Sequence, residues 1–471
     1  MPDLIGFVNE ISASPTVRLD LSDGAVWRVD LNGTSLAPPR LKRASYGNFI
    51  ADGEHVAAST YSDRDVRLSL TLTTANTNAM ATQLQNLARE LDRATNILRW
   101  WPAGATHPVF FETKRSDHDS IQQILAGAST SNVHKLIVPI RAKPFALGLK
   151  ETLSAAVVTN DPATGCYFDV PSPKGDVETP LYIVFPASSV IASGRKQTVL
   201  ATRRRGTPGN APWILQAEAM TLSGATTLPG ADATASGAGS NYARATGLTS
   251  SFVTRLAGTF APTPSVENRG KYRLYARVRK TTGGGEVRIR LAFSPDGVNE
   301  YIPDSVGVVL PFNTAWRWAD LGVIQVPMGD DPLTDGPGGA EYAARGYEIR
   351  LQMSLTAASS NLDTDCVVAM PADDRFTRVL WPGTSGATSM VLDSSARPKV
   401  YGVGASNELY STQIRALDSA PGPVISPGAY NRVWILDDVG GTSTAGHVLS
   451  GSMTVTPYYW PRYLSIRPST T

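Results

Sequence analysis

The chain has 471 residues and a mass of 50.2 kDa, which excludes a single small domain because domains usually run to about 100–200 residues. Hydrophobic residues make up 42% and charged residues 18%, so the chain can build packed cores and lacks the charge density of a disordered tail. Lys and Arg number 43 against 41 Asp and Glu, and this near balance argues against nucleic acid as a partner; no segment predicts membrane insertion.

The first segment of the chain carries strand patterns. Residues 17–31 alternate apolar and polar side chains on both sides of Asp23-Gly24, which predicts a hairpin about that turn. A second alternating run covers residues 66–73 and places its apolar side chains on one sheet face. Strands resume near residues 109–112 and 136–142. We therefore expect a small β-barrel or sandwich here.

One stretch of the chain has a helical period. Apolar residues recur at steps of three and four over residues 80–98, which predicts an amphipathic helix that ends before Pro102. Asn76 or Thr77 would cap its first turn. Residues 1–150 are thus predicted to form a β-barrel or sandwich with one packed α-helix.

Beyond residue 150 the pattern is all-β, with short alternating runs separated by Gly, Pro, Ser and Asn. Two stretches that mix charge with Pro and Gly, residues 202–212 and 371–386, bracket a block with its own run of strands. The strands expected inside this block are 255–260, 271–280, 286–293, 316–326, 347–355 and 365–370. We expect them to form an antiparallel sandwich.

Catalytic motifs are missing from the sequence. None of the five histidines has metalloprotease spacing, and there is no nucleophile elbow, P-loop or dinucleotide fingerprint. Adjacent acids such as Asp373-Asp374 point to opposite sides of a strand, although acids on different strands could meet, so an all-β polysaccharide hydrolase stays open as the third reading. Cys166 and Cys366 are expected to be buried hydrophobes. The prediction is a protein that is not an enzyme.

The order of several segments resembles a known family. Residues 46–98 look like a strand-then-helix layout, and residues 174–185 like the opening strand of a galectin-like sandwich. The runs 389–404, 423–436 and 455–464 are similar to the closing hairpins and final strand of that sandwich. Together these segments resemble the distal tail and minor tail proteins of long-tailed, siphovirus-type bacteriophages.

The resemblance implies a structural virion protein located at the tail tip and assembled in the host cytoplasm. Residues 1–150 would form an oligomeric ring, typically a hexamer, that joins the tail tube to the baseplate or fibre region. The implied partners are further copies of the chain, the tail tube protein, and tail hub or fibre proteins. No cofactor is implied for this part.

The middle of the chain departs from that family. Residues 151–210 and 381–471 would be the two parts of a galectin-like sandwich, and residues 211–380 an inserted jelly roll that looks like a carbohydrate-binding module. Loops accept such insertions because loop-closure entropy grows slowly with length. A division into one sandwich before residue 380 and another after it stays open. The alternative function is a host-surface adhesin that binds cell-wall glycan.

The jelly-roll resemblance implies two sites. Glu218 with Asp363 or Asp365 match the positions that hold a structural calcium in such modules, although Gln216 stands where the family often has a further acid. The predicted sugar-stacking aromatics are Trp316, Trp318, Tyr301 and Tyr242. Trp316 and Trp318 are two residues apart and share a strand face, and for them we favour the core.

Overall fold

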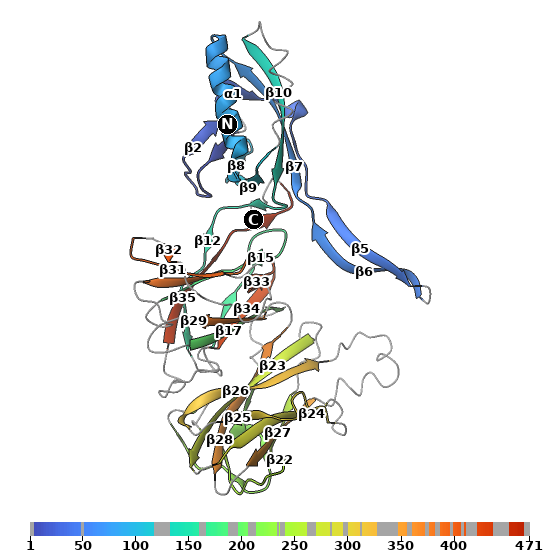
Figure 1. Ribbon diagram of the computed structural model, residues 1–471, viewed down its shortest axis with the longest axis vertical. Helices are drawn as coiled ribbons and strands as arrows, with labels where there is room; N and C mark the ends of the chain where they lie inside the picture. Colours follow the sequence, from blue (N-terminus) through green and yellow to red (C-terminus); the bar gives the residue numbers. More distant parts are fainter. Residues whose placement is uncertain are drawn as a thin grey trace. The chain divides into compact units, whose positions relative to one another are not determined.

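The computed structural model shows a mainly β protein with one α-helix in the part that it describes (Figure 1). It describes residues 4–48, 51–116, 132–159, 166–186, 196–205, 213–232, 235, 241–260, 270–282, 285–294, 300–310, 313–326, 347–355, 360–372, 376–381, 387–395, 399–406, 409–410, 422–436 and 452–465. The predicted fold class is therefore confirmed. Parts of both predicted seams, namely 206–212, 373–375 and 382–386, lie outside the described residues. Among the described residues, no helix has the length and hydropathy needed to span a membrane.

The chain divides into two compact units. Unit 1 comprises Met1–Glu151, Lys174–Thr179 and Tyr459–Thr471, and unit 2 comprises Thr152–Pro173 and Pro180–Tyr458. Unit 1 therefore includes both ends of the chain.

Unit 1 is built on a ten-stranded antiparallel sheet that curls toward a barrel. The order along its main path is β2-β1-β8-β9-β10-β7-β3, and β4, β11 and β36 pair at its sides. The strands are β1 (Leu4–Val8), β2 (Val17–Asp20), β3 (Trp27–Val29), β4 (Ser35–Leu36), β7 (Arg64–Thr73), β8 (Thr95–Trp101), β9 (Val109–Lys114), β10 (Val133–Ala142), β11 (Ala146–Leu147) and β36 (Arg462–Tyr463); a 3-10 turn, η1, covers Leu31–Gly33.

The predicted hairpin over residues 17–31 is wrong. Asp23-Gly24 does form a turn, with Gly24 at a φ of 75°, but β2 pairs with β1 and β3 pairs with β7. The Asp23 carboxylate accepts hydrogen bonds from the backbone N–H groups of residues 25, 26 and 27. These hydrogen bonds hold the turn, and the two strands that it connects lie at opposite ends of the sheet order.

Helix α1 (Thr77–Asp92) packs its apolar stripe on the unit 1 core. Asn76 is the N-cap, because its Oδ1 accepts a hydrogen bond from Ala79 N–H at 2.8 Å. The helix is shorter than predicted, since residues 95–101 form strand β8 between β1 and β9. Two neighbouring strands satisfy the backbone of this β-branched and aromatic segment, and this pairing overrides the helical spacing of Leu98.

A separate two-stranded ribbon leaves the unit 1 sheet (Figure 1). It consists of β5 (Leu41–Asn48) and β6 (Ala51–Tyr61), which pair with each other over their length. The ribbon was not expected from the sequence.

Unit 2 contains an inserted block of strands. The strands that come before and after this block in the sequence pair with each other in the flanking sheets. The strands that flank the insertion are β13 (Ala156–Thr159), β14 (Tyr167–Val170), β16 (Tyr182–Pro186), β17 (Lys196–Arg205), β29 (Phe376–Trp381), β30 (Ser389–Asp393), β31 (Lys399–Val403), β32 (Leu409–Tyr410), β33 (Val424–Ile425) and β34 (Tyr430–Leu436), with β12 (Glu151–Thr152), β15 (Thr179–Pro180) and β35 (Ser452–Tyr459) at the unit boundary. β16 pairs with β30 and β35, and β17 pairs with β29 and β34. Strands before residue 206 thus share sheets with strands after residue 375.

The insertion, strands β18 to β28, is a sandwich of its own. One sheet has the order β20-β21-β28-β23-β26 with β18 beside β28, and the other has the order β19-β22-β27-β24-β25. A single apolar core fills the space between them. The strands are β18 (Trp213–Gln216), β19 (Thr221–Leu222), β20 (Thr226–Thr227), β21 (Ala243–Ala245), β22 (Val253–Phe260), β23 (Gly270–Thr282), β24 (Val287–Ser294), β25 (Val308–Leu310), β26 (Asn313–Val326), β27 (Tyr347–Leu355) and β28 (Asn361–Pro371), with a 3-10 turn, η2, at Ala217–Ala219.

Candidate functional site

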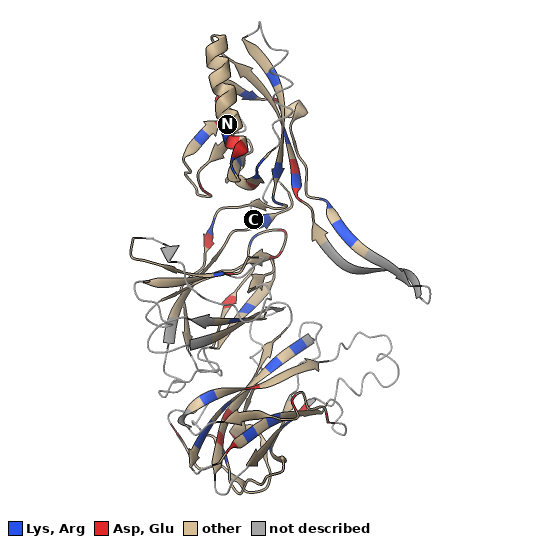
Figure 2. Ribbon diagram, in the orientation of Figure 1, with Lys and Arg blue, Asp and Glu red and all other residues tan. Residues whose placement is uncertain are grey.

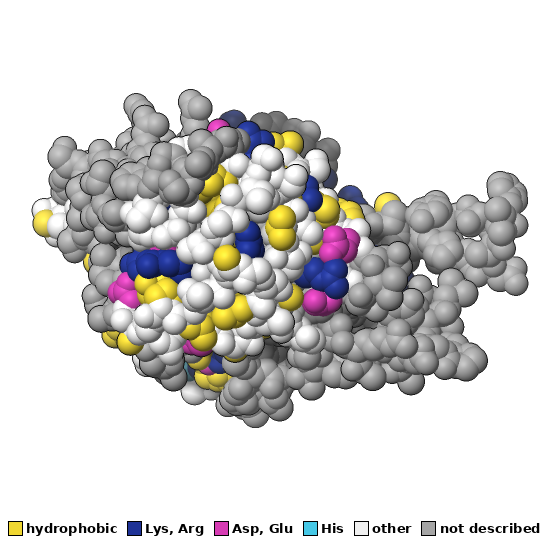
Figure 3. Space-filling model, turned by 90° about the horizontal axis from the view of Figure 1, so that it is seen from below, with side chains coloured by type: hydrophobic (Ala, Val, Ile, Leu, Met, Phe, Trp, Pro, Cys, Tyr) yellow, Lys and Arg dark blue, Asp and Glu magenta, His cyan; other side chains and the backbone are white. Residues whose placement is uncertain are grey.

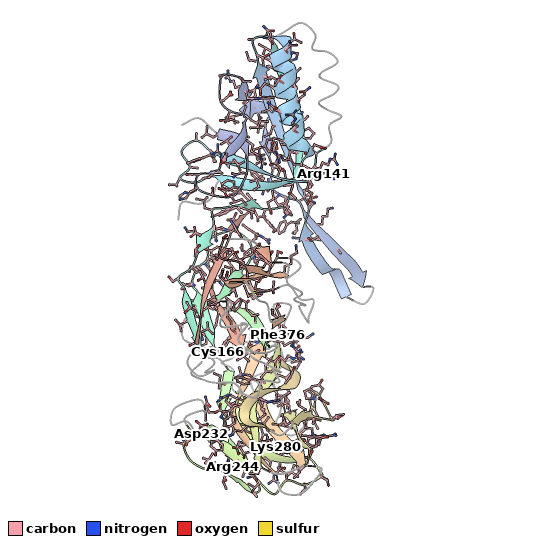
Figure 4. All side chains as sticks on the ribbon, turned by 60° about the vertical axis from the view of Figure 1, so that its left-hand side comes forward. Arg141, Cys166, Asp232, Arg244, Lys280 and Phe376 are labelled. Carbon is pink, nitrogen blue, oxygen red and sulfur yellow. The ribbon has the colours of Figure 1, made fainter. Side chains whose placement is uncertain are left out.

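Asp363, one of the predicted calcium ligands, lies fully buried on β28 of the insertion. Arg244 donates to both of its carboxylate oxygens, at 2.7 and 2.9 Å, and Arg279 donates to Oδ2 at 2.9 Å. Arg279 also pairs with Asp232 at 2.6 Å. Figure 4 shows Asp232 and Arg244 in the same region of the insertion. The hydrogen bonds to Asp363 raise the pKa of Arg244.

Asp365 and Glu218, the other two predicted ligands, lie close to each other. Asp365 accepts a hydrogen bond from Arg277 Nη1 at 2.6 Å, and both residues of this pair are fully buried. Glu218 Oε2 is buried and has no hydrogen-bond partner among the described residues. Burial raises the pKa of Glu218, its own backbone hydrogen bond lowers it, and the charge of Asp365 raises it further.

These contacts do not make a calcium cage. Calcium takes 6–8 oxygen ligands, whereas the oxygens of Asp363 and Asp365 accept hydrogen bonds from guanidinium groups. No three His, Cys, Asp or Glu side chains are placed to hold a metal ion within the described part of the chain. The calcium prediction therefore gains no support from the geometry.

Three of the four predicted sugar-stacking aromatics are buried. Tyr242 and Trp316 pack edge to face with ring centroids 5.8 Å apart, and their exposed fractions are 7% and 3%. The guanidinium of Arg279 lies over both rings, 4.3 Å from the Trp316 centroid and 4.9 Å from that of Tyr242. Trp318 is buried in a different cluster. These three rings are too buried to stack on a sugar in this conformation, which agrees with the core position favoured for Trp316 and Trp318 but not with the glycan site expected at Tyr242; the Tyr301 ring is exposed by 58%.

Trp318 belongs to an apolar cluster that joins the insertion to the flanking sheets within unit 2. The cluster also holds Cys166 and Phe376 from the flanking strands, both labelled in Figure 4, and Cys366 from β28. Both cysteines are buried free thiols. Because the sequence analysis expected buried cysteines and favoured the core for Trp318, this cluster accounts for all of them as packing residues.

An ion-pair network reinforces the same junction. Asp320 on β26 of the insertion accepts hydrogen bonds from Arg273 on β23 and from Arg378 on flanking strand β29. Most basic side chains of the insertion therefore serve internal contacts. On the face drawn in Figure 3, basic and apolar side chains lie in small separate groups.

Unit 1 presents surfaces of a different kind. The β7–β10 ladder runs for ten residue pairs, and along both strands buried side chains alternate with exposed or half-buried ones. One sheet face packs on the core, and the side chains of the other face are exposed or half-buried in the part of the chain that the structure describes. Beside it, the β5–β6 ribbon has residues 41–44 exposed on both of its faces, with Leu41 exposed by 42%. The sequence signal for the open face was strict alternation with charged outward positions, which we read only as a strand.

Comparisons with known proteins give no family. No family model and no curated protein matches the chain. Among solved structures, the SPP1 Dit protein, described as a paradigm of the hub adsorption apparatus in phages that infect Gram-positive bacteria, is 9% identical with a TM-score of 0.35, over 98% of this chain and 99% of that one. A chain of the phage P2 baseplate in its activated, calcium-bound conformation is 6% identical with a TM-score of 0.33, over 98% of both chains. TM-scores this low establish no shared fold, so these likenesses carry no weight for function.

Proposed function

We propose that this chain is a non-enzymatic structural component of a bacteriophage tail tip, in which unit 1 assembles with copies of itself into a ring. The observation that carries the proposal is the β5–β6 ribbon, two strands of 8 and 11 residues that pair with no further strand of the described chain. The order of the sequence segments, which resembles that of distal and minor tail proteins, supplies the tail context.

The ribbon is physically incomplete as an isolated element. A two-stranded hairpin is marginal in water, and each of its edges presents unpaired backbone N–H and C=O groups. Its exposed start, residues 41–44, has no apolar face buried against unit 1. A closed ring provides each ribbon with a neighbouring copy and leaves no copy unpaired.

The finer proposal is that six copies form this ring and that it joins the tail tube to the baseplate or fibre region. The flanking sheets and the insertion of unit 2 would then decorate the ring, and the tail tube, hub and fibre proteins would be the partners. On this proposal the protein resides in the virion and is assembled in the host cytoplasm.

The test shortens the ribbon while leaving the unit 1 sheet intact. Residues 45–57 are replaced by a two-residue Asn-Gly turn, so that the paired residues Ala44 and Ala58 flank the turn and the β5–β6 base is retained. We expect the full chain to form rings by negative-stain electron microscopy and the shortened chain to stay monomeric with unchanged circular dichroism. Rings of the same size from the shortened chain would remove the ribbon from the interface, and a monomeric full chain would contradict ring assembly itself.

The adhesin remains a second candidate because Tyr301 is exposed. It follows Glu300, which accepts a hydrogen bond from Arg350. The exposed aromatic ring of Tyr301 therefore lies next to polar groups of the kind that bind sugar hydroxyls. Tyr301→Ala should abolish retention on host cell-wall polysaccharide, while Val309→Ala, at another exposed apolar position in the insertion, should not. Equal retention of both variants would exclude Tyr301, and no retention of the wild-type chain would exclude the adhesin.

A further inference from the structure

The open face of the β3–β4–β7–β10 part of the unit 1 sheet is strongly basic. Cross-strand register puts Arg28, Thr71 and Lys135 in one row of this face. Further along the strands, Arg67 lies beside Pro139, and Arg141 lies beside Asp65. The face thus carries four basic side chains and, among the outward residues of these strands, one acidic side chain. Figure 2 marks basic residues on these strands, and Figure 4 labels Arg141.

These four cations are exposed side chains on one face of a single sheet. Arg28, Arg67, Lys135 and Arg141 are all exposed, and none makes an ion pair or hydrogen bond within the described residues. By contrast, Arg115 near helix α1 pairs with Asp92. Among the described residues, this sheet face therefore holds four cations against one carboxylate, Asp65.

Their spacing suits a polyanion. Antiparallel strands rise about 3.4 Å per residue, so Lys135 and Arg141 stand roughly 20 Å apart along β10. Arg28 and Lys135 flank β7 and are separated by two strand spacings, about 10 Å. A DNA duplex offers a phosphate every 3.4 Å or so along each strand, so long flexible cations on such a surface meet several phosphates without a fixed register.

We infer that this face binds the phosphate backbone of double-stranded DNA without sequence preference. Phosphate contacts from Arg and Lys release condensed counterions, and this release drives the association. The near-zero net charge of the whole chain, from which we predicted no nucleic-acid partner, is a sum over all residues and does not describe the local excess of cations on this one sheet face. The inference goes beyond ring assembly and does not depend on it.

The test measures binding of the full chain to a short mixed-sequence DNA duplex by fluorescence anisotropy. Four phosphate contacts predict that affinity falls roughly 100-fold between about 50 and 200 mM salt, whereas two contacts predict a fall of about 10-fold. Arg67→Gln with Lys135→Gln should show the shallower salt dependence and bind roughly 100-fold more weakly at 50 mM salt. The double variant Arg28→Gln with Arg141→Gln should show the same weakening and the same shallower salt dependence. It serves as the second variant if the first is unstable.

The matched control removes the same charge elsewhere in unit 1. Arg115 and Lys174 are exposed but paired with Asp92 and Glu151, so Arg115→Gln with Lys174→Gln should leave the affinity and its salt dependence unchanged. Equal weakening in the control would overturn the site, and so would an absence of DNA binding by the wild-type chain. If the basic-face variants instead impair only self-association, the face binds an acidic surface of a second copy and the inference is wrong. Ring formation is measured separately by microscopy, so the result for ring assembly and the result for DNA binding can be told apart.

Discussion

The buried charges of the insertion are satisfied pair by pair. Arg277 and Asp365 are both fully buried and joined at 2.6 Å, and Arg279 and Asp363 form a second pair on neighbouring strands. Such pairs contribute little net stability relative to apolar residues, yet each depends on both partners, since an uncompensated buried charge is costly. The aspartates that the sequence suggested as metal ligands therefore bind arginine side chains of the chain itself.

The first prediction removes one partner of the buried pair. Asp365→Ala leaves the Arg277 guanidinium buried without its carboxylate, so we expect the free energy of unfolding to fall by about 3–5 kcal/mol. Asp63→Ala breaks the exposed pair with Lys114 and should cost at most about 1 kcal/mol. Urea denaturation followed by tryptophan fluorescence measures both. Equal, small effects would show that Arg277 finds another partner.

The second prediction concerns alkaline pH. Burial, with smaller effects of nearby acidic groups, raises the pKa of Tyr463 to about 12, against an ordinary value near 10. The neutral phenol therefore stabilises the fold below pH 10, and this contribution is lost as the pH rises through about 12. Arg64 acts in the opposite direction, since burial lowers the pKa of its guanidinium to about 10.

Tyr463→Phe isolates the tyrosine from Arg64. Wild-type stability should fall by about 1 kcal/mol more than that of the variant between about pH 9 and pH 11, as measured by urea denaturation at each pH. An identical pH dependence in both proteins would mean that the Tyr463 phenol titrates normally.

At the scale of single residues, sequence patterns predict which strand face a residue shares with its neighbours better than they predict whether that residue is buried. Trp316 and Trp318 were expected on one strand face and are buried in the structure, yet nothing local shows that Tyr242 is buried as well while Tyr301 is exposed. Burial of Tyr242 depends on Trp316 and Arg279, which are distant in sequence. Pairing of Asp363 with Arg244 across 119 positions is equally invisible to local patterns.

At the scale of elements, local rules predict starts and strands well. The six strands expected in the insertion are all present, because period-two alternation on a half-buried sheet is a strong signal. Helix α1 begins where the capping residue predicts, but its end was placed too late because strand pairing of β8 is a tertiary effect. The ribbon was not predicted because it extends beyond the core. Strands that pack on the core alternate apolar and polar residues, and the ribbon lacks this signal.

The third prediction tests the helix cap. Asn76→Ala removes the acceptor for the Ala79 N–H group and should lower the free energy of unfolding by about 1 kcal/mol. Thr77→Ala, one residue later, removes no described capping bond, and because Ala has the higher helix propensity it should change the free energy of unfolding by less than about 0.5 kcal/mol. Thermal denaturation followed by circular dichroism compares the two. A larger loss of stability from Thr77→Ala than from Asn76→Ala would show that Asn76 is not the capping residue.

At the scale of the whole molecule, strand pairing joins segments that lie far apart in the sequence. The chain before and after the insertion shares sheets, with Ala201 opposite Phe376 on β17 and β29, so the insertion begins and ends near one place in the flanking sheets. Sequence periodicity identifies strands but not their partners, so the interrupted arrangement and two successive sandwiches looked alike.

The fourth prediction follows from that connection. Replacing residues 206–375 by a short Gly/Ser linker should leave the flanking sheets paired and ring assembly intact, because β17 and β29 are already neighbours. The thermal midpoint should fall, since Phe376 and Trp434 lose part of their apolar cover. Circular dichroism and light scattering measure fold and mass. Loss of assembly in a folded product would place the insertion in the ring interface.

The most direct test of the account is to image the purified full chain at high concentration by electron microscopy and count the copies about the particle axis. The account predicts closed rings, with six copies, held together through unit 1. Particles that remain single chains at every concentration, with no rotational symmetry, would contradict it.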